Sequence, residues 1–583
     1  MHLLKRMHFV AGLCVAASVV GVLIGAPAWA QESTERGERG IVISPAQNDT
    51  DDTAIVATPA LALETVLPPI PEKLPGGPLA STDQITVHRI IIEGSTVLDD
   101  AEVTLLTGAL ENRPIGVEDL HDLRHRLSEM YLQRGYVNSG VVLPDQRIDD
   151  GVIRLQAVEG SVTRLVIVGN TTLRDSYLEK RIRRGIASPL NSNDLQRALK
   201  ILQADSRVRQ INARLLPGSV PGESVLHVNV VENTNHWVRT ALDNYRSPSV
   251  DENRFSLSAG NRNFTGNGDI LVLEVGATKG LDDLDVYYSF PLTATDLRIA
   301  AYYTKTDSAV VEEPFNVIDI TSDSETRGLS LSRPFRSDSG RLLTATLGLE
   351  NREVANSLLD MPFSFTPGEV DGASEVSVAY LSGEWLWQTR ERIIGVVASA
   401  RFGVDLFDPT IQASAPDSRF TALRFQFQYA RTMNWRDSQF IVRSSAQFTS
   451  DSLLALEKFA VGGHTTVRGY RENTLVRDNG IVASLEMQFP LFVDEEGRER
   501  FNLQVAPFID YGIAWDSDNS LRTSHKDDLV SVGVGIRWRP LPGWTVRADY
   551  GYALTDVVTP TETLQDKGLQ FRIEYTMTPF KKN

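Results

Sequence analysis

The second half of the chain alternates apolar and polar residues, and this period of two limits what it can fold into. In residues 501–515, FNLQVAPFIDYGIAW, odd positions are mostly large and apolar, and even positions include Asn502, Gln504 and Asp510. Similar alternation recurs in residues 423–429, 530–538, 544–552 and 569–577. Because successive side chains of a strand point to opposite faces, each segment predicts a strand with one apolar and one polar face.

The polar face of these segments distinguishes two kinds of β-protein. A soluble sandwich packs the apolar faces of two sheets against each other. Here charges and glycines recur on the partner face of strand after strand, and the strands are long enough to cross a bilayer at a tilt. This pattern favours an outer-membrane barrel with apolar residues outside and polar residues inside. The roughly 350 residues of 233–583, at about 10 per membrane strand plus turns, predict a transmembrane antiparallel β-barrel of about 16 strands.

Residues 1–30 have the pattern of a signal peptide. Lys5 and Arg6 precede an apolar run that is short for a membrane anchor, and Ala28-Trp29-Ala30 forms a small-residue cleavage site. Cleavage would remove Cys14, the only cysteine, and would change the net charge from −17 to −19 because Lys5 and Arg6 leave with it. The pattern predicts an exported protein, and the acidic charge argues against nucleic acid as a partner.

Residues 31–82 predict a linker. The segment is rich in proline, for example at Pro68, Pro69 and Pro71, and it holds few aromatic residues with which to build a core. A short helix over residues 53–66 is the only regular structure that the segment indicates.

An internal repeat follows the linker. Residues 90–100, IIIEGSTVLDD, align with residues 165–175, LVIVGNTTLRD, and each copy precedes a helical pattern and two strands. The repeat predicts two β-α-α-β-β modules, over residues 83–160 and 161–232. Such modules either add an extended peptide at an open sheet edge or serve as spacers. We take the last strand, SVLHVNVV at 224–231, as the docking edge.

A polar, glycine-rich loop at residues 462–480, GGHTTVRGYRENTLVRDNG, carries Arg468, Arg471 and Arg477. Charge alone favours a solvated loop arginine at position 468. The alternation, however, places Asp510 on the inner face of its strand, so a loop folded back into the barrel would set Arg468 against Asp510. Gly469 would then let the backbone approach the wall, and Tyr470 would pack there.

Several motifs together resemble the two-partner secretion transporters, the haemolysin secretion and activation (TpsB) type of outer-membrane protein. VRGY resembles the inward-folded sixth extracellular loop of that family, FIDYG its F-x-D-x-G strand motif, and NRNFTGNGD at 261–269 its early-barrel signature. Residues 136–160 resemble the end of its first POTRA domain (polypeptide-transport-associated domain). The inward-loop motif comprises Val467, Arg468, Gly469 and Tyr470, and the wall motif comprises Phe508, Asp510 and Gly512.

The resemblance implies two POTRA domains in the periplasm of a Gram-negative bacterium and a barrel of about 16 strands in its outer membrane. It implies that the protein exports a large, unfolded exoprotein, contacts outer-membrane lipid, and is inserted by the barrel assembly machinery. No enzyme activity, cofactor or metal is expected, since the nine histidines show no metal-ligand spacing. Gly266 and Gly268 precede a strand pattern, which predicts a hairpin turn rather than a phosphate loop.

Two features depart from the family pattern, and two other functions share the architecture. The family often has a plug helix before its POTRA domains, where residues 31–82 predict a linker. It usually ends on an aromatic residue, whereas Phe580 precedes Lys581, Lys582 and Asn583, although the pattern of Asp566, Gly568, Phe571 and Ile573 resembles an assembly signal. The alternatives are a barrel assembly factor of the same superfamily and a passive porin or receptor, which would not need the repeats.

Overall fold

The structure is a computed structural model, and it describes residues 63–65, 84–148, 150–337, 340–413, 416–435, 438–493, 499–517 and 527–578. It divides into two compact units, one with most residues up to Thr234 and one with most residues from Asn235. The predicted signal peptide and nearly all of the predicted linker lie outside the described residues. Within the predicted helix 53–66, the described residues Leu63–Thr65 form strand β1, because they pair with the edge of a neighbouring strand, so the helix prediction is wrong there.

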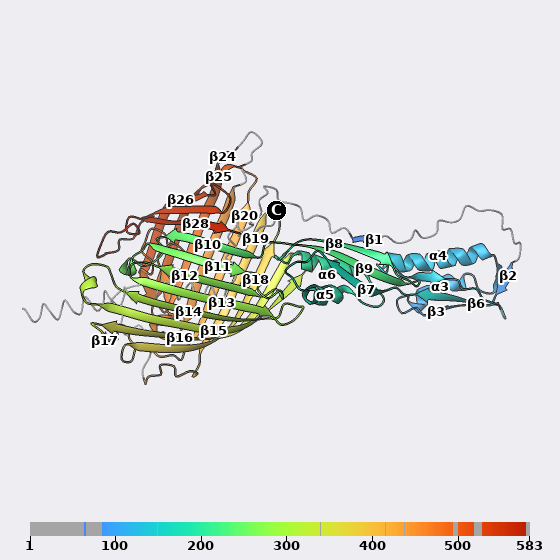
Figure 1. The fold of residues 1–583 in the computed structure, drawn as a ribbon, viewed down its shortest axis with the longest axis horizontal. Helices are drawn as coiled ribbons and strands as arrows, with labels where there is room; N and C mark the ends of the chain where they lie inside the picture. Colours follow the sequence, from blue (N-terminus) through green and yellow to red (C-terminus); the bar gives the residue numbers. More distant parts are fainter. Residues whose placement is uncertain are drawn as a thin grey trace, which may run out of the picture. The chain divides into compact units, whose positions relative to one another are not determined.

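The larger unit is a closed antiparallel barrel. Within the described residues, sixteen long strands pair in chain order, and β28 pairs with β10 to complete the circle (Figure 1). The strands are β10 (His236–Asp243), β11 (Arg254–Asn261), β12 (Ile270–Ala277), β13 (Leu281–Pro291), β14 (Arg298–Ala309), β15 (Ile320–Ser337), β16 (Arg341–Leu358), β18 (Ala373–Gln388), β19 (Arg392–Gly403), β20 (Thr421–Thr432), β21 (Gln439–Thr449), β24 (Asn479–Val493), β25 (Glu499–Trp515), β26 (Asp527–Trp538), β27 (Trp544–Ala553) and β28 (Leu569–Met577). A two-residue strand, β17 (Met361–Pro362), lies beside β16, and 3-10 turns occur at η2 (Pro248–Val250) and η3 (Phe315–Val317).

Burial along the strands follows the alternation in the sequence. On β25, Ile509 and Tyr511 are 46% and 40% exposed, whereas Asp510 between them is fully buried. The same contrast separates exposed Phe425 and Val534 from their polar or small neighbours on β20 and β26. A closed sheet leaves no strand edge unpaired in lipid, and its apolar faces point outward. The predicted β-barrel of about 16 strands, apolar outside and polar inside, is confirmed.

The smaller unit contains two α/β modules. The first comprises β2 (Ile85–Val87), β3 (Arg89–Glu93), α3 (Asp100–Gly108), β4 (Arg113–Ile115), α4 (Val117–Gln133), β5 (Gly140–Val142) and β6 (Val152–Val158). The second comprises β7 (Ser161–Val168), α5 (Asp175–Ile182), η1 (Arg183–Gly185), α6 (Ser192–Gln203), β8 (Val208–Pro217) and β9 (Glu223–Glu232). None of the described helices has the length and hydropathy that a membrane span needs.

The two modules share one sheet topology. In the first, β6 lies between a parallel partner, β3, and an antiparallel partner, β5. In the second, β9 lies between parallel β7 and antiparallel β8, and β1 pairs with the outer side of β8. Apart from the separate β2–β4 pair of the first module, both modules therefore have the β-α-α-β-β order that the internal repeat predicts.

The predicted docking edge is wrong. Because β9 is paired on both sides, it offers no open edge to an added strand. Leu226, Val228 and Val230 are instead fully buried in the core of the second module.

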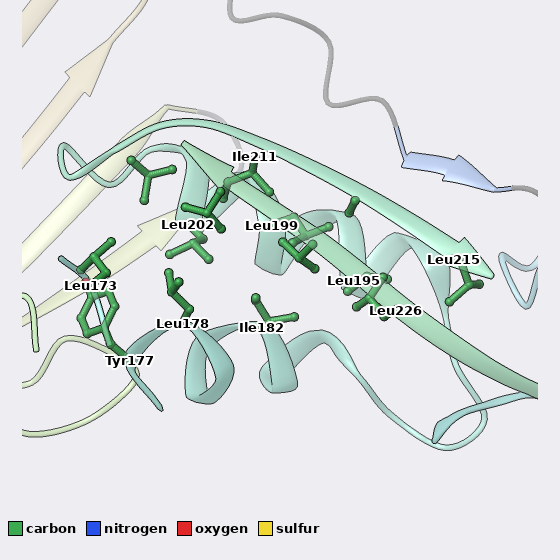
Figure 2. Packing of buried hydrophobic residues seen from close by; sticks show 14 of the residues in the cluster. Leu173, Tyr177, Leu178, Ile182, Leu195, Leu199, Leu202, Ile211, Leu215 and Leu226 are labelled. Atoms are coloured by element: carbon green, nitrogen blue, oxygen red, sulfur yellow. The ribbon is translucent and has the colours of Figure 1, made fainter. Parts of the chain in front are cut away.

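Leucine spacing builds that core. Leu195, Leu199 and Leu202 lie four and three residues apart on α6, which brings them to one face of the helix. Figure 2 shows them together with Leu178 and Ile182 of α5, facing the sheet. The amphipathic helices thus cover one side of the sheet with a continuous apolar layer.

A glutamate at the end of the last strand accepts several hydrogen bonds in each module. Glu159 Oε1 accepts hydrogen bonds from the Thr96 backbone at 2.6 Å and the Tyr131 hydroxyl at 2.9 Å. Glu232 Oε1 accepts them from the backbone N–H groups of Thr171 and Leu173 at 2.8 and 2.9 Å. The carboxylates fix the turns that follow β3 and β7, so the structural repeat extends beyond the aligned segments.

The Glu232 interaction predicts an acid-dependent stability of the second module. Burial raises the pKa of Glu232, but hydrogen bonds from Thr172, Leu173 and Thr171 outweigh it and hold this pKa below its ordinary value. A carboxylate of this kind stabilises the fold fully above its unfolded pKa, about 4.3, and loses this effect as the pH falls through the lowered value. We expect Glu232→Gln to lower the free energy of unfolding by about 1–2 kcal/mol at pH 7, with the difference vanishing in acid.

Limited proteolysis of the full-length protein in detergent, across a urea series at several pH values, measures this effect. Glu223→Gln is the matched control, because it makes the same chemical change at the other end of β9. Equal loss of stability in the two variants would contradict the role of Glu232.

Candidate functional site

The segment between β21 and β24, residues 450–478, folds inside the barrel, and we call it the inner loop. It contains η4 (Ala455–Glu457) and a hairpin of β22 (Phe459–Val461) and β23 (Leu475–Arg477). Val461 and Val467 are fully buried, and the side chains that contact the loop lie on the inner faces of the barrel strands. The loop predicted at 462–480 belongs to this segment, except that Asn479 and Gly480 begin β24.

Arg468 and Asp510 form a two-pronged ion pair. Arg468 Nε lies 2.8 Å from Asp510 Oδ2, and Nη2 lies 2.9 Å from Oδ1. The Arg468 backbone N–H also donates to Oδ2 at 3.1 Å. Arg468 is 3% exposed and Asp510 is 0% exposed, so the pair is shielded from water. Parallel N–H···O bonds from one guanidinium fix the direction of the loop as well as its position.

Two further carboxylates meet the same guanidinium. Arg468 Nη1 lies 2.5 Å from Glu486 Oε2 on β24 and 3.3 Å from Asp549 Oδ1 on β27. Arg537 bridges these two acids at 3.0 and 2.8 Å, and Arg547 lies 2.8 Å from Asp549. With Arg443 at 3.9 Å from Glu486, three carboxylates and four guanidiniums share the site. Arg468 is the ion-pair partner of Asp510, so removing either residue leaves the other as a buried charge without this pair, which costs about 3–5 kcal/mol.

Gly469 and Tyr470 bring the loop against β27 and β28. Gly469 has a φ of +92°, and a Cβ there would lie 2.7 Å from the Gly551 carbonyl oxygen, so only glycine permits this approach. The Tyr470 hydroxyl donates to the Val530 carbonyl at 2.7 Å and accepts from the Thr555 backbone at 2.9 Å. Gln570 donates to the Tyr470 carbonyl at 3.0 Å.

The wall motif receives the loop on three consecutive inward positions of β25. The Arg468 guanidinium lies 3.5 Å above the centre of the Phe508 ring, and a cation stacks favourably on this face. Gly512 leaves space for the loop, since a Cβ there would lie 2.8 Å from Val467 Cγ2. The structure therefore brings all of the predicted motif residues, 467–470 with 508, 510 and 512, to one place.

The sequence reasoning missed several members of this site. Glu486, Arg537 and Asp549 were not singled out, although strand parity gives each of them an inward position like that of Asp510. Arg471 was noted only as a loop residue. Its Nε lies 2.5 Å from Asp566 Oδ1 and its Nη1 lies 2.8 Å from Glu312 Oε1, so it ties the inner loop to the β27–β28 and β14–β15 connections of the barrel.

The early-barrel signature forms the turn of the second hairpin of the barrel. Gly266 and Gly268 lie in the turn between β11 and β12 with positive φ, which confirms the predicted hairpin turn. Asp269 is fully buried and accepts a hydrogen bond from the Tyr288 hydroxyl at 3.0 Å. Among the described residues, no group of three or more His, Cys, Asp or Glu side chains is placed to hold a metal ion.

The burial of Arg468 predicts that its removal releases the inner loop. Arg468→Gln leaves Asp510, Glu486 and Asp549 with one cation fewer, so a state in which water hydrates them gains population. We expect the open fraction in single-channel recordings to rise about tenfold, equivalent to about 1.4 kcal/mol. The heat-modifiable electrophoretic mobility of the barrel is expected to stay unchanged, because the strand pairing does not use this side chain.

Arg477→Gln is the control for this measurement. Arg477 is a second loop arginine that pairs with Asp527 at 2.7 Å, but it is 30% exposed. An exposed pair contributes little, so channel opening should stay near that of the parent. Equal channel opening in Arg468→Gln and the parent would show that the buried cluster does not hold the loop.

Comparisons with known proteins identify the family to which the barrel belongs. The family model "Haemolysin secretion/activation protein ShlB/FhaC/HecB" matches residues 222–538, and the model "POTRA domain, ShlB-type" matches residues 85–160. The outer membrane transporter CdiB of Dickeya dadantii is 24% identical over 494 residues, which cover 79% of this chain and 83% of that protein. The heme/hemopexin transporter protein HuxB of Haemophilus influenzae is 22% identical, with 73% and 75% covered.

Solved structures agree on the fold. CdiB from Escherichia coli superposes with a TM-score of 0.60 at 18% identity, covering 87% of this chain and 93% of that chain. BamA from Haemophilus ducreyi lacking POTRA domains 1–3 superposes with a TM-score of 0.51 at 14% identity, covering 85% and 100%. The chain belongs to the haemolysin secretion/activation protein family ShlB/FhaC/HecB, as an outer-membrane β-barrel transporter of two-partner secretion whose POTRA region is periplasmic.

Proposed function

We propose that this transporter exports one large exoprotein of haemolysin or adhesin type, and that the inner loop closes its path at rest. The exoprotein enters unfolded from the periplasm and passes through the barrel, and its folding outside drives export without an enzymatic step. The observation that carries the proposal is the buried cluster around Arg468, which holds the inner loop inside the lumen.

The chemistry of the cluster suits a closure that can be reversed. Its carboxylates and guanidiniums all sit on side chains that water can hydrate once the lumen fills, so opening does not leave them bare. A two-state element of this kind needs only a few kcal/mol of differential interaction to change its dominant state. We propose that residues 467–470 and the wall residues Phe508, Asp510 and Gly512 set this balance.

We also propose that residues 161–232 form a second POTRA domain beside the matched one. The shared arrangement of three strands, with the last strand central, and the equivalent roles of Glu159 and Glu232 support this assignment. The exoprotein would dock as an added strand at an outer edge of a POTRA sheet, where backbone N–H and C=O groups can pair with it. In the second module the outer strands of the repeat unit are β7 and β8, and β1 already pairs with part of β8.

The remaining partners follow from the surface of the barrel. We propose that its exposed apolar faces contact outer-membrane lipid and that the barrel assembly machinery inserts it. Nucleic acid is not proposed as a partner, because the net charge of −17 disfavours it.

A reversible crosslink between the loop and the wall tests the closure. Val467 Cγ2 lies 2.8 Å from a Cβ built on Gly512, and Val461 Cγ1 lies nearer still, so a cysteine at 512 is within reach of one at 467 after a small displacement of the Val461 side chain. We expect the Val467→Cys, Gly512→Cys double variant to release no exoprotein when oxidised and to recover when reduced. Mass spectrometry of the culture medium measures the exoprotein, and each single variant is a control.

Two results would contradict the proposal. Export at the parental level by the oxidised double variant, with the crosslink verified, would mean that the loop does not close the path. A loss of other outer-membrane barrels on oxidation, with exoprotein release unaffected, would favour the assembly-factor function, whose fold BamA shares.

A further inference from the structure

The inner loop carries a second buried charge, eleven residues before Arg468. Glu457 lies at the end of η4 and is 1% exposed. Its Oε1 is 3.1 Å from Arg352 Nη1 of β16, and its Oε2 is 3.4 Å from both Arg401 Nε of β19 and Arg424 Nη2 of β20. Three arginines on three barrel strands thus converge on one carboxylate of the loop.

Backbone and apolar contacts hold the same part of the loop. Arg352 Nη1 donates to the Leu456 carbonyl at 3.2 Å, and Gln447 Nε2 donates to the Glu457 carbonyl at 2.9 Å. Leu453, Leu454 and Leu456 pack against inward valines of β16 and β18. The backbone that carries Glu457 is therefore fixed to the barrel wall by hydrogen bonds and apolar packing as well as by the ion pairs.

The charge balance of this site depends on Glu457. Arg352 and Arg401 are fully buried and share Glu350, whose Oε1 lies 2.7 Å from Arg352 Nη2. With Arg424, three guanidiniums face two carboxylates, Glu350 of the wall and Glu457 of the loop. When the loop leaves, Glu457 leaves with it, so these buried arginines exchange its carboxylate for water in the lumen.

The two charged sites have opposite polarity. At Glu457 an acidic loop residue meets a basic wall on β16, β19 and β20. At Arg468 a basic loop residue meets an acidic wall on β24, β25 and β27. An exchange of the two contacts would bring like charges together, so the pair of sites allows only one placement of the loop across the lumen.

We infer that Glu457 is a positioning residue that holds the inner loop closed through Arg352, Arg401 and Arg424, independently of the Arg468 cluster. This inference deepens the proposed function, on which its meaning for export rests. Both contacts must release before the lumen can open.

Accessibility of a buried reporter thiol tests the inference without any exoprotein. Val461 lies between the two charged sites in the chain and is fully buried, and Val461→Cys is the parent for all variants. In isolated outer membranes we expect Glu457→Gln to raise the rate at which a small membrane-impermeant maleimide labels the introduced thiol about tenfold, equivalent to about 1.4 kcal/mol. Glu457→Asp, which keeps the charge, is expected to restore most of the protection.

A matched control separates loop release from general weakening of the barrel. The Asp283 side chain of β13 is 3% exposed and lies 2.5 Å from Arg254 of β11, so Asp283→Asn also removes a buried carboxylate from an ion pair between barrel strands. We expect this variant to be labelled at the parental rate. An equal increase in Asp283→Asn and Glu457→Gln would overturn the inference, as would parental labelling of a folded Glu457→Gln barrel.

A milder variant covers the case in which Glu457→Gln does not assemble. The Arg424 side chain is 16% exposed and lies 3.4 Å from Glu457, so it is the least buried of the three arginines. Arg424→Gln should therefore fold and give a smaller increase in labelling. Parental labelling of that variant would overturn the inference. Because the rate is measured without cargo, a failure of the export proposal would leave this result unchanged.

Discussion

The pairing of β10 with β28 is the contact on which the rest of the barrel depends. Six residue pairs, from Val238–Met577 to Asp243–Arg572, join the first and last strands. Without them two strand edges would lie in lipid with unpaired N–H and C=O groups, each of which costs several kcal/mol. Closure then directs every second side chain inward, so charges that are distant in the sequence share one interior.

An interior lined with charged side chains is stable only if each charge has a partner or water. The inner loop supplies partners of both signs, since Arg468 meets acids on one side and Glu457 meets arginines on the other. The site is a network rather than a single pair. A charge swap between Arg468 and Asp510, which a lone pair would tolerate, would here place a new carboxylate beside Glu486 and Asp549.

The two α/β modules are each stabilised by a hydrogen-bonded glutamate in the equivalent place. Each must order a glycine turn, after β3 or β7, and each does so with a carboxylate at the end of its last strand, Glu159 just after β6 or Glu232 of β9. The lowered pKa of both carboxylates reflects these hydrogen bonds acting against burial. The sequence repeat covers the turn but not the glutamate that holds it, because the two are about sixty residues apart.

The sequence by itself determined the properties that depend on local spacing. Strand parity gives the inward face of Asp510, and helical spacing gives the buried face of Leu195 and Leu199. Parity cannot say which inward charges meet, because that depends on register. Ser484 lies opposite Asp510 and Gly535 opposite Asp549, and only this alignment brings Glu486 and Asp549 to one guanidinium. The prediction that β9 offers a docking edge was wrong for the same reason. β9 is the last strand of its module in the sequence but a central strand of its sheet, because it pairs with β7 over a long sequence separation. Tertiary structure alone decided these matters, because strand order and register are set by contacts between residues far apart in the chain.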